Sequence, residues 1–342
     1  MMHTESPNQE NTLAVVIPAY NAAAYMRGLL TRIMSNKRVS EVIVVDDCST
    51  DPTAKIAARF AAQDPRIRLV SQPRNLGAGA ARNRGLLEVR AEYCIFLDAD
   101  DRLEEQALDK AMAALDEEPA DFLVFKWFYT DSEGRARAIR MYGQDEEIWD
   151  EIVGARRVLR CQTIEHQNIT RTANFPWNKI YRTRFLREKR IRFSETFVHN
   201  DNLAHWMSYS LCDSFTLFNH YCIGHKEDRS YGQLTQVWDW RRMQIFDVFM
   251  EIDSFMLGLP QELHALYVHF TLYKHQMLYW IGQHISDETL PVFAAKAALA
   301  FANVDSLLFF RLLTVNAMDA RDIYDIRFDP HRFFAELRAR AR

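Results

Sequence analysis

The chain lacks several features that mark other classes of protein. Its 342 residues include five cysteines, whose spacing fits neither a disulfide framework nor a metal cluster. Cys48 and Cys94 lie beside or inside predicted strands, so reduced thiols in a cytoplasmic protein are the simplest interpretation. No stretch reaches the roughly 18 to 20 apolar residues that cross a bilayer. Residues 1–12 are polar and contain no apolar core of a signal peptide.

An excess of positive charge is also missing. The chain has 42 Lys and Arg against 46 Asp and Glu, which gives a formal net charge of -4. This composition provides no basic field for nucleic acid, so no nucleic-acid partner is expected. The sequence contains no internal repeat and no P-loop lysine motif. Its length suits a full catalytic domain with an accessory region.

Short apolar runs alternate with helical segments over the first third of the chain. Near-continuous Val, Ile and Leu strands that alternate with helices favour an α/β fold with a mostly parallel sheet covered on both faces. In such sheets ligands bind beyond the carboxyl ends of the strands, where the strand order reverses. The predicted strands are residues 13–17, 42–45, 67–70, 93–97 and 121–129, and helices are predicted at residues 22–34, from residue 52, and at residues 78–89.

Acidic residues follow two of these strands. Asp46–Asp47 end the second run, and Asp98–Asp101 end the fourth. Because strand side chains alternate between faces, Asp98 and Asp100 are expected to share a face. Two hard oxygen donors at a strand end suit a divalent cation that itself holds a phosphate. A solvated loop is the alternative interpretation.

Asp101 has a second structural interpretation. Glu104 follows it three residues later, a spacing that resembles a capping box. The spacing therefore predicts a helix that starts near Leu103, with Asp101 as its cap.

Four segments together resemble a known family: residues 16–21, 44–51, 75–85 and 96–101. In order and spacing they are similar to the motifs of family 2 glycosyltransferases of the GT-A fold. Residues 77–82 do not fit a dinucleotide fingerprint, because Arg82 stands where a small residue is needed. The resemblance implies a GT-A sheet sandwiched by helices and a metal-dependent, inverting sugar transfer from a nucleotide diphosphate sugar.

The resemblance also implies roles for single residues. Asp47 would accept a hydrogen bond from the base, plausibly N3–H of uracil, so a UDP-linked donor is expected. Asp100 would ligate Mn²⁺ or Mg²⁺ with Asp98 beside it, and the ion would neutralise the diphosphate. For Arg82 and Arg84 a helix-surface charge is the alternative. The residues expected to bind the nucleotide sugar are Pro18, Tyr20, Asn21, Asp47, Ser49, Arg82, Arg84, Asp98 and Ala99.

The second third resembles the family at fewer places. Residues 176–195 are similar to the stretches that precede the family's acidic pair, where the catalytic base lies. Here the pair is replaced by Asn200–Asp201, so Asp201 matches the base and Asn200 departs from the pattern. Asp201 would take the proton from the acceptor hydroxyl. The alternatives are a cap for the predicted helix 203–211 and a non-catalytic nucleotide-sugar or glycan-binding relative. Transfer of a non-sugar group from a nucleotide carrier also stays open.

Later segments suggest fewer roles. His225, Lys226 and Arg229 match a loop that folds over the diphosphate in many relatives, with an ordinary loop as the alternative. The acceptor is expected to be a glycan or a lipid-linked glycan. The Arg-rich segment 331–342 fits a packed terminal helix better than a peripheral contact with the inner face of a membrane. We expect a polar tail (1–12), a nucleotide-sugar half (13–130), an acceptor half (131–232) and a helical C-terminal region (233–342).

Overall fold

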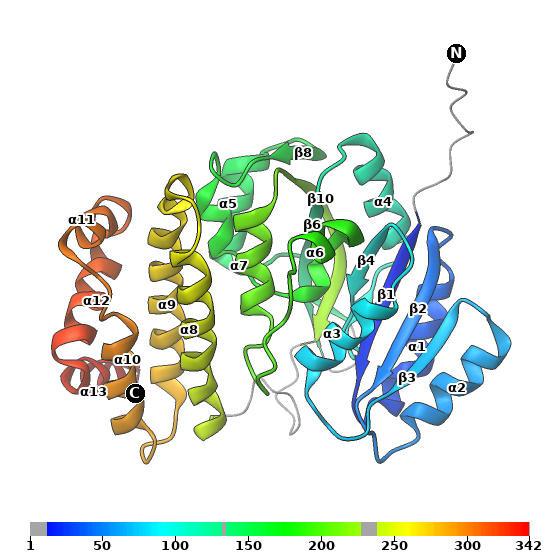
Figure 1. The fold of residues 1–342 in the computed structure, drawn as a ribbon, viewed down its shortest axis with the longest axis horizontal. Coiled ribbons are helices and arrows are strands. Elements are labelled where there is room, and N and C mark those ends of the chain that lie inside the picture. Colours follow the sequence, from blue (N-terminus) through cyan, green and yellow to red (C-terminus); the bar gives the residue numbers. More distant parts are fainter. Residues whose placement is uncertain (1–11, 132–134, 227–237, 342) are drawn as a thin grey trace. The chain divides into compact units, whose positions relative to one another are not determined.

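The structure is a computed structural model that describes residues 12–131, 135–226 and 238–341 (Figure 1). The chain divides into two compact units. The first takes Met1–Gln162, Phe175–Glu195 and Leu211–Asp228, and the second takes Thr163–Asn174, Thr196–Ser210 and Arg229–Arg342.

One mixed sheet forms the centre of the first unit. Its strand order is β3-β2-β1-β4-β9-β6-β10-β5, with β7 beside β6 and β8 beside β10. The first four strands pair in parallel, as predicted, while β9 runs antiparallel between β4 and β6. The strands are β1 (Leu13–Ala19), β2 (Val39–Asp46), β3 (Ile67–Ser71), β4 (Tyr93–Phe96), β5 (Arg102–Leu103), β6 (Phe122–Thr130), β7 (Ala136–Ala138), β8 (Val158–Cys161), β9 (Lys179–Arg182) and β10 (Phe215–Lys226).

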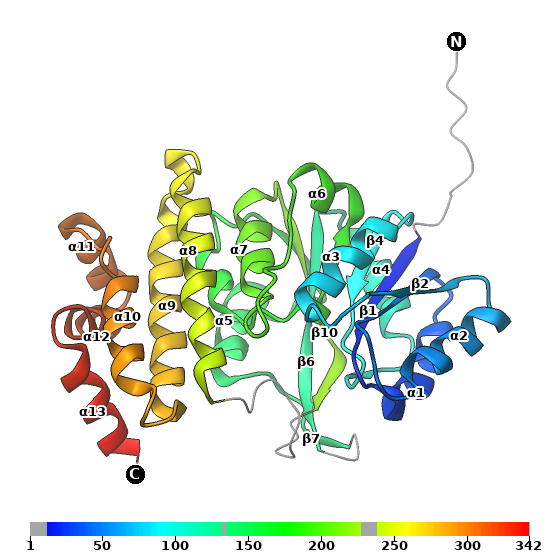
Figure 2. The ribbon, with the colours of Figure 1, turned by 60° about the horizontal axis from the view of Figure 1, so that its bottom comes forward.

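Helices flank this sheet on both faces (Figure 2). The backbone of α3 approaches β1 so closely that a Cβ at Gly85 would lie 2.3 Å from Cγ1 of Val16. This contact requires glycine, because the helix could not lie as near the strand with any side chain there. The helices are α1 (Ala23–Met34), α2 (Thr53–Gln63), α3 (Ala78–Glu88), α4 (Ala107–Glu117), α5 (Gly143–Val153) and α6 (Thr183–Glu188).

Two local predictions are wrong, namely the helix that starts near Leu103 and the strand position of Asp98 and Asp100. The helix expected near Leu103 does not form, because residues 102–103 pair as β5 with Ile223 and Gly224 of β10. The next helix begins only at Ala107, so Asp101 does not cap it. Strand β4 ends at Phe96, which leaves Asp98 and Asp100 in a loop. Strand alternation therefore does not explain where these carboxylates lie.

The second unit is helical, which confirms the expected helical C-terminal region. The terminal helix buries Phe334 and Leu337, and Arg338 donates to the carbonyl of Gly282, so it packs within this unit. Among the described residues, no helix combines the length and apolarity needed to cross a bilayer. The elements are η1 (Gln167–Arg171), α7 (Asn202–Leu211), η4 (Trp240–Met243), α8 (Gln244–Leu257), η5 (Gln261–Leu263), α9 (Ala265–His284), α10 (Leu290–Ala300), α11 (Ser306–Val315), α12 (Ala317–Phe328) and α13 (Pro330–Ala341).

Candidate functional site

Three carboxylates in the loop after β4 form the centre of the candidate site. Oδ1 of the buried Asp101 lies 3.0 Å from Nδ1 of His225 on β10. Oδ1 of Asp98 lies 2.6 Å from Nη2 of Arg82 on α3. The charge of Asp98 acts on Asp100, so these two carboxylates are near each other even though they do not share a strand. Segments distant in sequence thus meet beyond the carboxyl end of β4.

Burial and the neighbouring charges raise the pKa of two of these acids, Asp100 and Asp101. Burial raises the pKa of Asp101 to about 7, and burial together with the Asp98 charge raises the pKa of Asp100. Burial alone would lower the pKa of His225, but the carboxylates of Asp101 and Asp100 raise it above the usual value. A cation of higher charge would replace such protons and relieve the repulsion.

The donor atoms in this loop suit a hard divalent cation. Oδ2 of Asp101 is buried without a hydrogen bond among the described residues. Carboxylate oxygens are the ligands that Mg²⁺ and Mn²⁺ prefer. Within the part of the chain that the structure describes, no three His, Cys, Asp or Glu side chains form a complete metal-binding group. The loop therefore gathers hard oxygen donors without forming a complete group of metal ligands.

Aromatic rings fix the orientation of His225. Its imidazole stacks on Trp177 with ring centroids 5.3 Å apart, and Trp177 stacks on Phe175 at 4.4 Å. Trp127 of β6 meets the imidazole edge-on. Next to it, Nζ of Lys226 donates to the hydroxyl of Tyr25 at 3.2 Å. Of the predicted diphosphate loop, Arg229 lies outside the described residues.

Asp47 joins β2 to the glycine-rich segment before α3. Its Oδ1 accepts from the backbone N–H of Leu76 and from Nε2 of Gln72, each at 2.8 Å. Its Oδ2 accepts from the N–H of Gly77, also at 2.8 Å. Gly77 has φ 90°, a conformation that glycine adopts without strain. About one of the four acceptor positions of a carboxylate then remains, on Oδ2, for the predicted bond to a base.

Two neighbouring loops on this edge are tied by Asn21. Its side-chain oxygen accepts from the N–H of Thr50 at 2.8 Å, and its own N–H donates to the hydroxyl of Ser49 at 3.0 Å. Tyr20 beside it is 49% exposed, and Pro18 is partly exposed. The predicted base and ribose residues therefore share one edge, with the Tyr20 ring open to solvent.

The two arginines of α3 differ in their surroundings. Arg82 is buried, pairs with Asp98 and lies over the ring of Phe193 at 5.4 Å. Arg84 instead pairs with Glu88 one helical turn later and is 42% exposed. The structure thus brings Arg82, and not Arg84, to the carboxylate loop. Ala99 lies in the turn between Asp98 and Asp100.

Asp201 lies in the second unit, directly before α7. Its Oδ1 lies 3.4 Å from the amide nitrogen of Asn202, and its backbone carbonyl accepts from the N–H of His205. The hydroxyl of Tyr273 donates to Oδ1 of Asn202. Nε2 of His205 lies 2.8 Å from the carbonyl of Thr170.

A buried cation accompanies Asp201. Arg242 is held between the rings of Trp238 and Trp280, with Cζ 4.9 and 5.0 Å from their centroids. Its Nη1 lies 3.3 Å from Nε2 of His199. Burial and this guanidinium lower the pKa of His199 to about 3, so the imidazole is neutral and accepts the bond. Burial lowers the pKa of Arg242 to about 10, and the charge of Asp201 opposes that shift.

Sequence analysis missed several of these residues. The partnership of Asp101 with His225 joins positions 124 residues apart, so no local pattern indicates it. The contacts of Arg242 with Trp238 and Trp280 depend on tertiary packing, and no local pattern indicates them.

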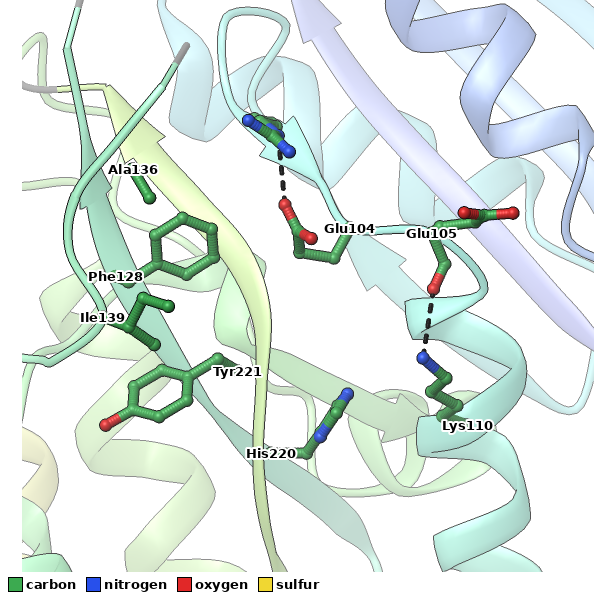
Figure 3. A pocket seen from close by; sticks show the side chains of 9 residues that line it. Glu104, Glu105, Lys110, Phe128, Ala136, Ile139, His220 and Tyr221 are labelled. Atoms are coloured by element: carbon green, nitrogen blue, oxygen red, sulfur yellow. Dashed lines mark hydrogen bonds and ion pairs between the residues drawn. The ribbon is translucent and has the colours of Figure 1, made fainter.

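One cavity lies apart from these residues (Figure 3). It measures about 340 Å³, and Phe128 of β6 forms part of its wall. Since successive side chains of a strand point to opposite faces, Phe128 and the Trp127 beside His225 face opposite sides of the sheet. The cavity therefore does not belong to the carboxylate site. Its lining is Arg102, Glu104, Glu105, Lys110, Phe128, Ala136, Ile139, His220 and Tyr221.

Known proteins resemble this chain in sequence and fold. Residues 14–189 match the family described as Glycosyl transferase family 2. Glycosyltransferase GlyA of Streptococcus pneumoniae is 26% identical over 75% of this chain and 36% of its own length. Succinoglycan biosynthesis protein ExoO of Rhizobium meliloti is 32% identical over 53% of this chain and 50% of its own. The chain thus spans half or less of these two relatives.

Solved structures show the same fold at low identity. Residues 1–349 of Staphylococcus aureus TarS, in complex with UDP-GlcNAc, superpose with a TM-score of 0.78 and 19% identity, covering 96% of this chain and 91% of that one. The mannosyltransferase PcManGT of Pyrobaculum calidifontis, in complex with GDP-Man and Mn²⁺, gives a TM-score of 0.52 and 17% identity, covering 97% and 85%.

Proposed function

Since the chain belongs to glycosyl transferase family 2, we propose that it transfers a sugar from a nucleotide diphosphate sugar to a glycan or lipid-linked glycan, with inversion. The observation that carries this proposal is the group of three carboxylates, Asp98, Asp100 and Asp101, in the loop beyond the carboxyl end of β4, two of which have a raised pKa. A UDP-linked donor is the choice that Asp47 supports, because its remaining acceptor position suits an imide N–H. The TarS structure with UDP-GlcNAc is consistent with that choice.

Asp100 and Asp98 would hold Mn²⁺ or Mg²⁺. Such an ion neutralises charge on the departing nucleotide. Two protein carboxylates with substrate phosphates form a common coordination sphere for these ions. Arg82 fixes the Asp98 carboxylate by its 2.6 Å contact, which leaves the second oxygen of Asp98 for the ion. His225 and Lys226 lie on the strand that enters the predicted diphosphate loop.

Asp201 would act as the general base. In a single displacement one carboxylate removes the proton from the acceptor hydroxyl while the nucleotide departs from the other side of the sugar. The guanidinium of Arg242 acts electrostatically on Asp201, and a nearby cation favours an ionised carboxylate. Asn200 is neutral, so it does not repel the charge of Asp201 as a second acid would.

A thermal-shift panel of sugar nucleotides, with and without Mn²⁺, tests the donor class. Tight donor binding raises the melting temperature by mass action. UDP-sugars are expected to stabilise the protein only with metal. A protein indifferent to every sugar nucleotide would contradict the proposal and favour a different nucleotide carrier.

Two variants separate binding from catalysis. Asp100→Ala should abolish transfer and metal-dependent donor binding with the fold intact, whereas Asp201→Asn should abolish turnover and retain donor binding. Glu105→Ala, an exposed carboxylate four residues after Asp101, is the matched control and should keep full activity. Donor binding without any hydrolysis or transfer in the wild type would instead identify a non-catalytic relative.

A further inference from the structure

The helical hairpin of α11 and α12 exposes a strongly apolar surface. Helix α11 has the sequence SLLFFRLLTV, yet Leu312 is the one residue of this helix that is buried. Phe310 is 65% exposed, and Met318 and Phe328 on α12 are 79% and 62% exposed. A surface helix normally turns its polar face to water and its apolar face to the core. Exposed apolar patches of this extent mark interaction sites.

Aromatic rings of the two helices pack against each other. The ring of Tyr324 lies 5.9 Å from that of Phe309 and 4.6 Å from that of Phe328, which joins α11 to α12. We call the exposed apolar residues of both helices the hairpin surface. Its members are Leu307, Phe310, Leu313, Val315, Met318, Tyr324 and Phe328.

The area of the hairpin surface is comparable to that of a stable dimer interface. With on the order of 180 Å² for a fully exposed large apolar or aromatic residue, these seven side chains present about 700 Å² to water. A standard interface covers about 800 Å² on each partner. A rim of polar residues would supply the remainder.

Charge distinguishes between the candidates that could cover this surface. Residues 305–329 contain five Asp and three Arg, a formal charge of -2 (3 − 5), which anionic lipid and nucleic acid would repel. Several of these charges are already paired within the unit: Arg332 lies near Asp325 and Asp329, and His275 contacts Asp319. A second copy of the chain would bring the same apolar surface, and its small, partly paired charge would cause little electrostatic repulsion.

We propose that this chain self-associates through the hairpin surface, so that two copies cover it symmetrically. An isologous contact suits this arrangement, because the same apolar patch serves both partners. The proposal is independent of the proposed function, since no residue of the candidate site belongs to the hairpin surface.

Sedimentation equilibrium on the full chain between 1 and 50 µM tests the proposal. The wild type should approach twice its 40.1 kDa mass. Phe310→Glu and Phe328→Glu should each raise the dimer dissociation constant at least thirtyfold, the effect typical of a central aromatic anchor. Both positions are exposed, so the variants should keep the wild-type circular dichroism and melting profile.

Leu87→Glu is the matched control, because Leu87 is 75% exposed on α3 of the other unit; this variant should dimerise like the wild type. A wild type that stays monomeric at 50 µM would overturn the proposal, as would a dimer that survives both hairpin substitutions. Flotation with vesicles of phosphatidylglycerol and phosphatidylethanolamine supplies a further arm. A monomer that binds these vesicles through Phe310 and Phe328 would show that a membrane covers the surface, which also overturns the proposal.

Discussion

Two neighbouring acids of the carboxylate loop should affect stability in opposite directions. The guanidinium of Arg82 is 5% exposed and contacts Asp98 at 2.6 Å. Asp98→Asn would replace the anion that pairs with this buried charge by a neutral amide. Removing one partner of a fully buried pair costs about 3–5 kcal/mol. Because Asp98 is 33% exposed, water can replace part of its interaction, and we expect a loss of about 2–3 kcal/mol. For a unit of this size that lowers the melting temperature by roughly 5–10 °C.

Asp100 should behave differently. Burial and the charge of Asp98 raise its pKa in the folded protein above that of the unfolded chain. A carboxyl group with a raised folded pKa stabilises the protein below the unfolded pKa, and this stability is lost as pH rises through the folded pKa. Without metal, Asp100 therefore contributes less stability at pH 8 than at acidic pH. Asp100→Asn should leave the melting temperature unchanged or raise it at pH 8.

Thermal melts followed by circular dichroism in EDTA at pH 8 test this contrast. Asp116→Asn is the control, because Asp116 pairs with Arg38 at the surface and is 40% exposed. Such a pair contributes about 0–1 kcal/mol, so the control should melt close to the wild type. The reasoning is refuted if Asp98→Asn melts like the wild type, or if Asp100→Asn loses as much stability as Asp98→Asn.

Two further predictions concern packing and thiol reactivity. Gly85→Ala should destabilise the protein by about 1–3 kcal/mol by overpacking against β1. Gly28→Ala, whose new Cβ would meet no neighbouring atom within 4 Å, should stabilise α1 by about 0.5–1 kcal/mol. Urea denaturation measures both changes in the free energy of unfolding, and equal effects would contradict the close contact of Gly85 with β1. The exposed Cys48 should react with a disulfide reagent in the native protein. Cys94 and Cys222 are buried, and burial raises the pKa of Cys94 to about 12, so these two thiols should react only on unfolding. Fast reaction of Cys48, Cys94 and Cys222 alike in the native state would be inconsistent with this burial.

Local patterns predicted the first half of the sheet well. The runs at residues 13–17 and 42–45 are apolar on both faces, and β1 and β2 are correspondingly buried throughout most of their length. The same local reasoning failed at Leu103. The spacing of Asp101 and Glu104 favours a helix, but pairing with β10, more than a hundred residues later, holds that backbone as a strand.

The candidate site was predictable only where motifs are contiguous. Asp98, Asp100 and Asp201 could be named from their sequence neighbours, and their catalytic roles stay predictions. The cationic partners of two of these acids, Arg82 for Asp98 and Arg242 for Asp201, depend on tertiary packing. Burial raises the pKa of Asp101, and the local sequence does not indicate that this polar residue is buried.

We propose that the carboxylates after β4 hold a cation, which in turn binds a nucleotide diphosphate. Isothermal titration calorimetry with a UDP-sugar, in Mn²⁺ and in EDTA, measures this directly for the wild type and Asp100→Ala. We predict that Mn²⁺ strengthens binding to the wild type at least tenfold and has no effect on Asp100→Ala. Equal affinity in Mn²⁺ and EDTA, or a metal effect that persists in Asp100→Ala, would contradict the claim.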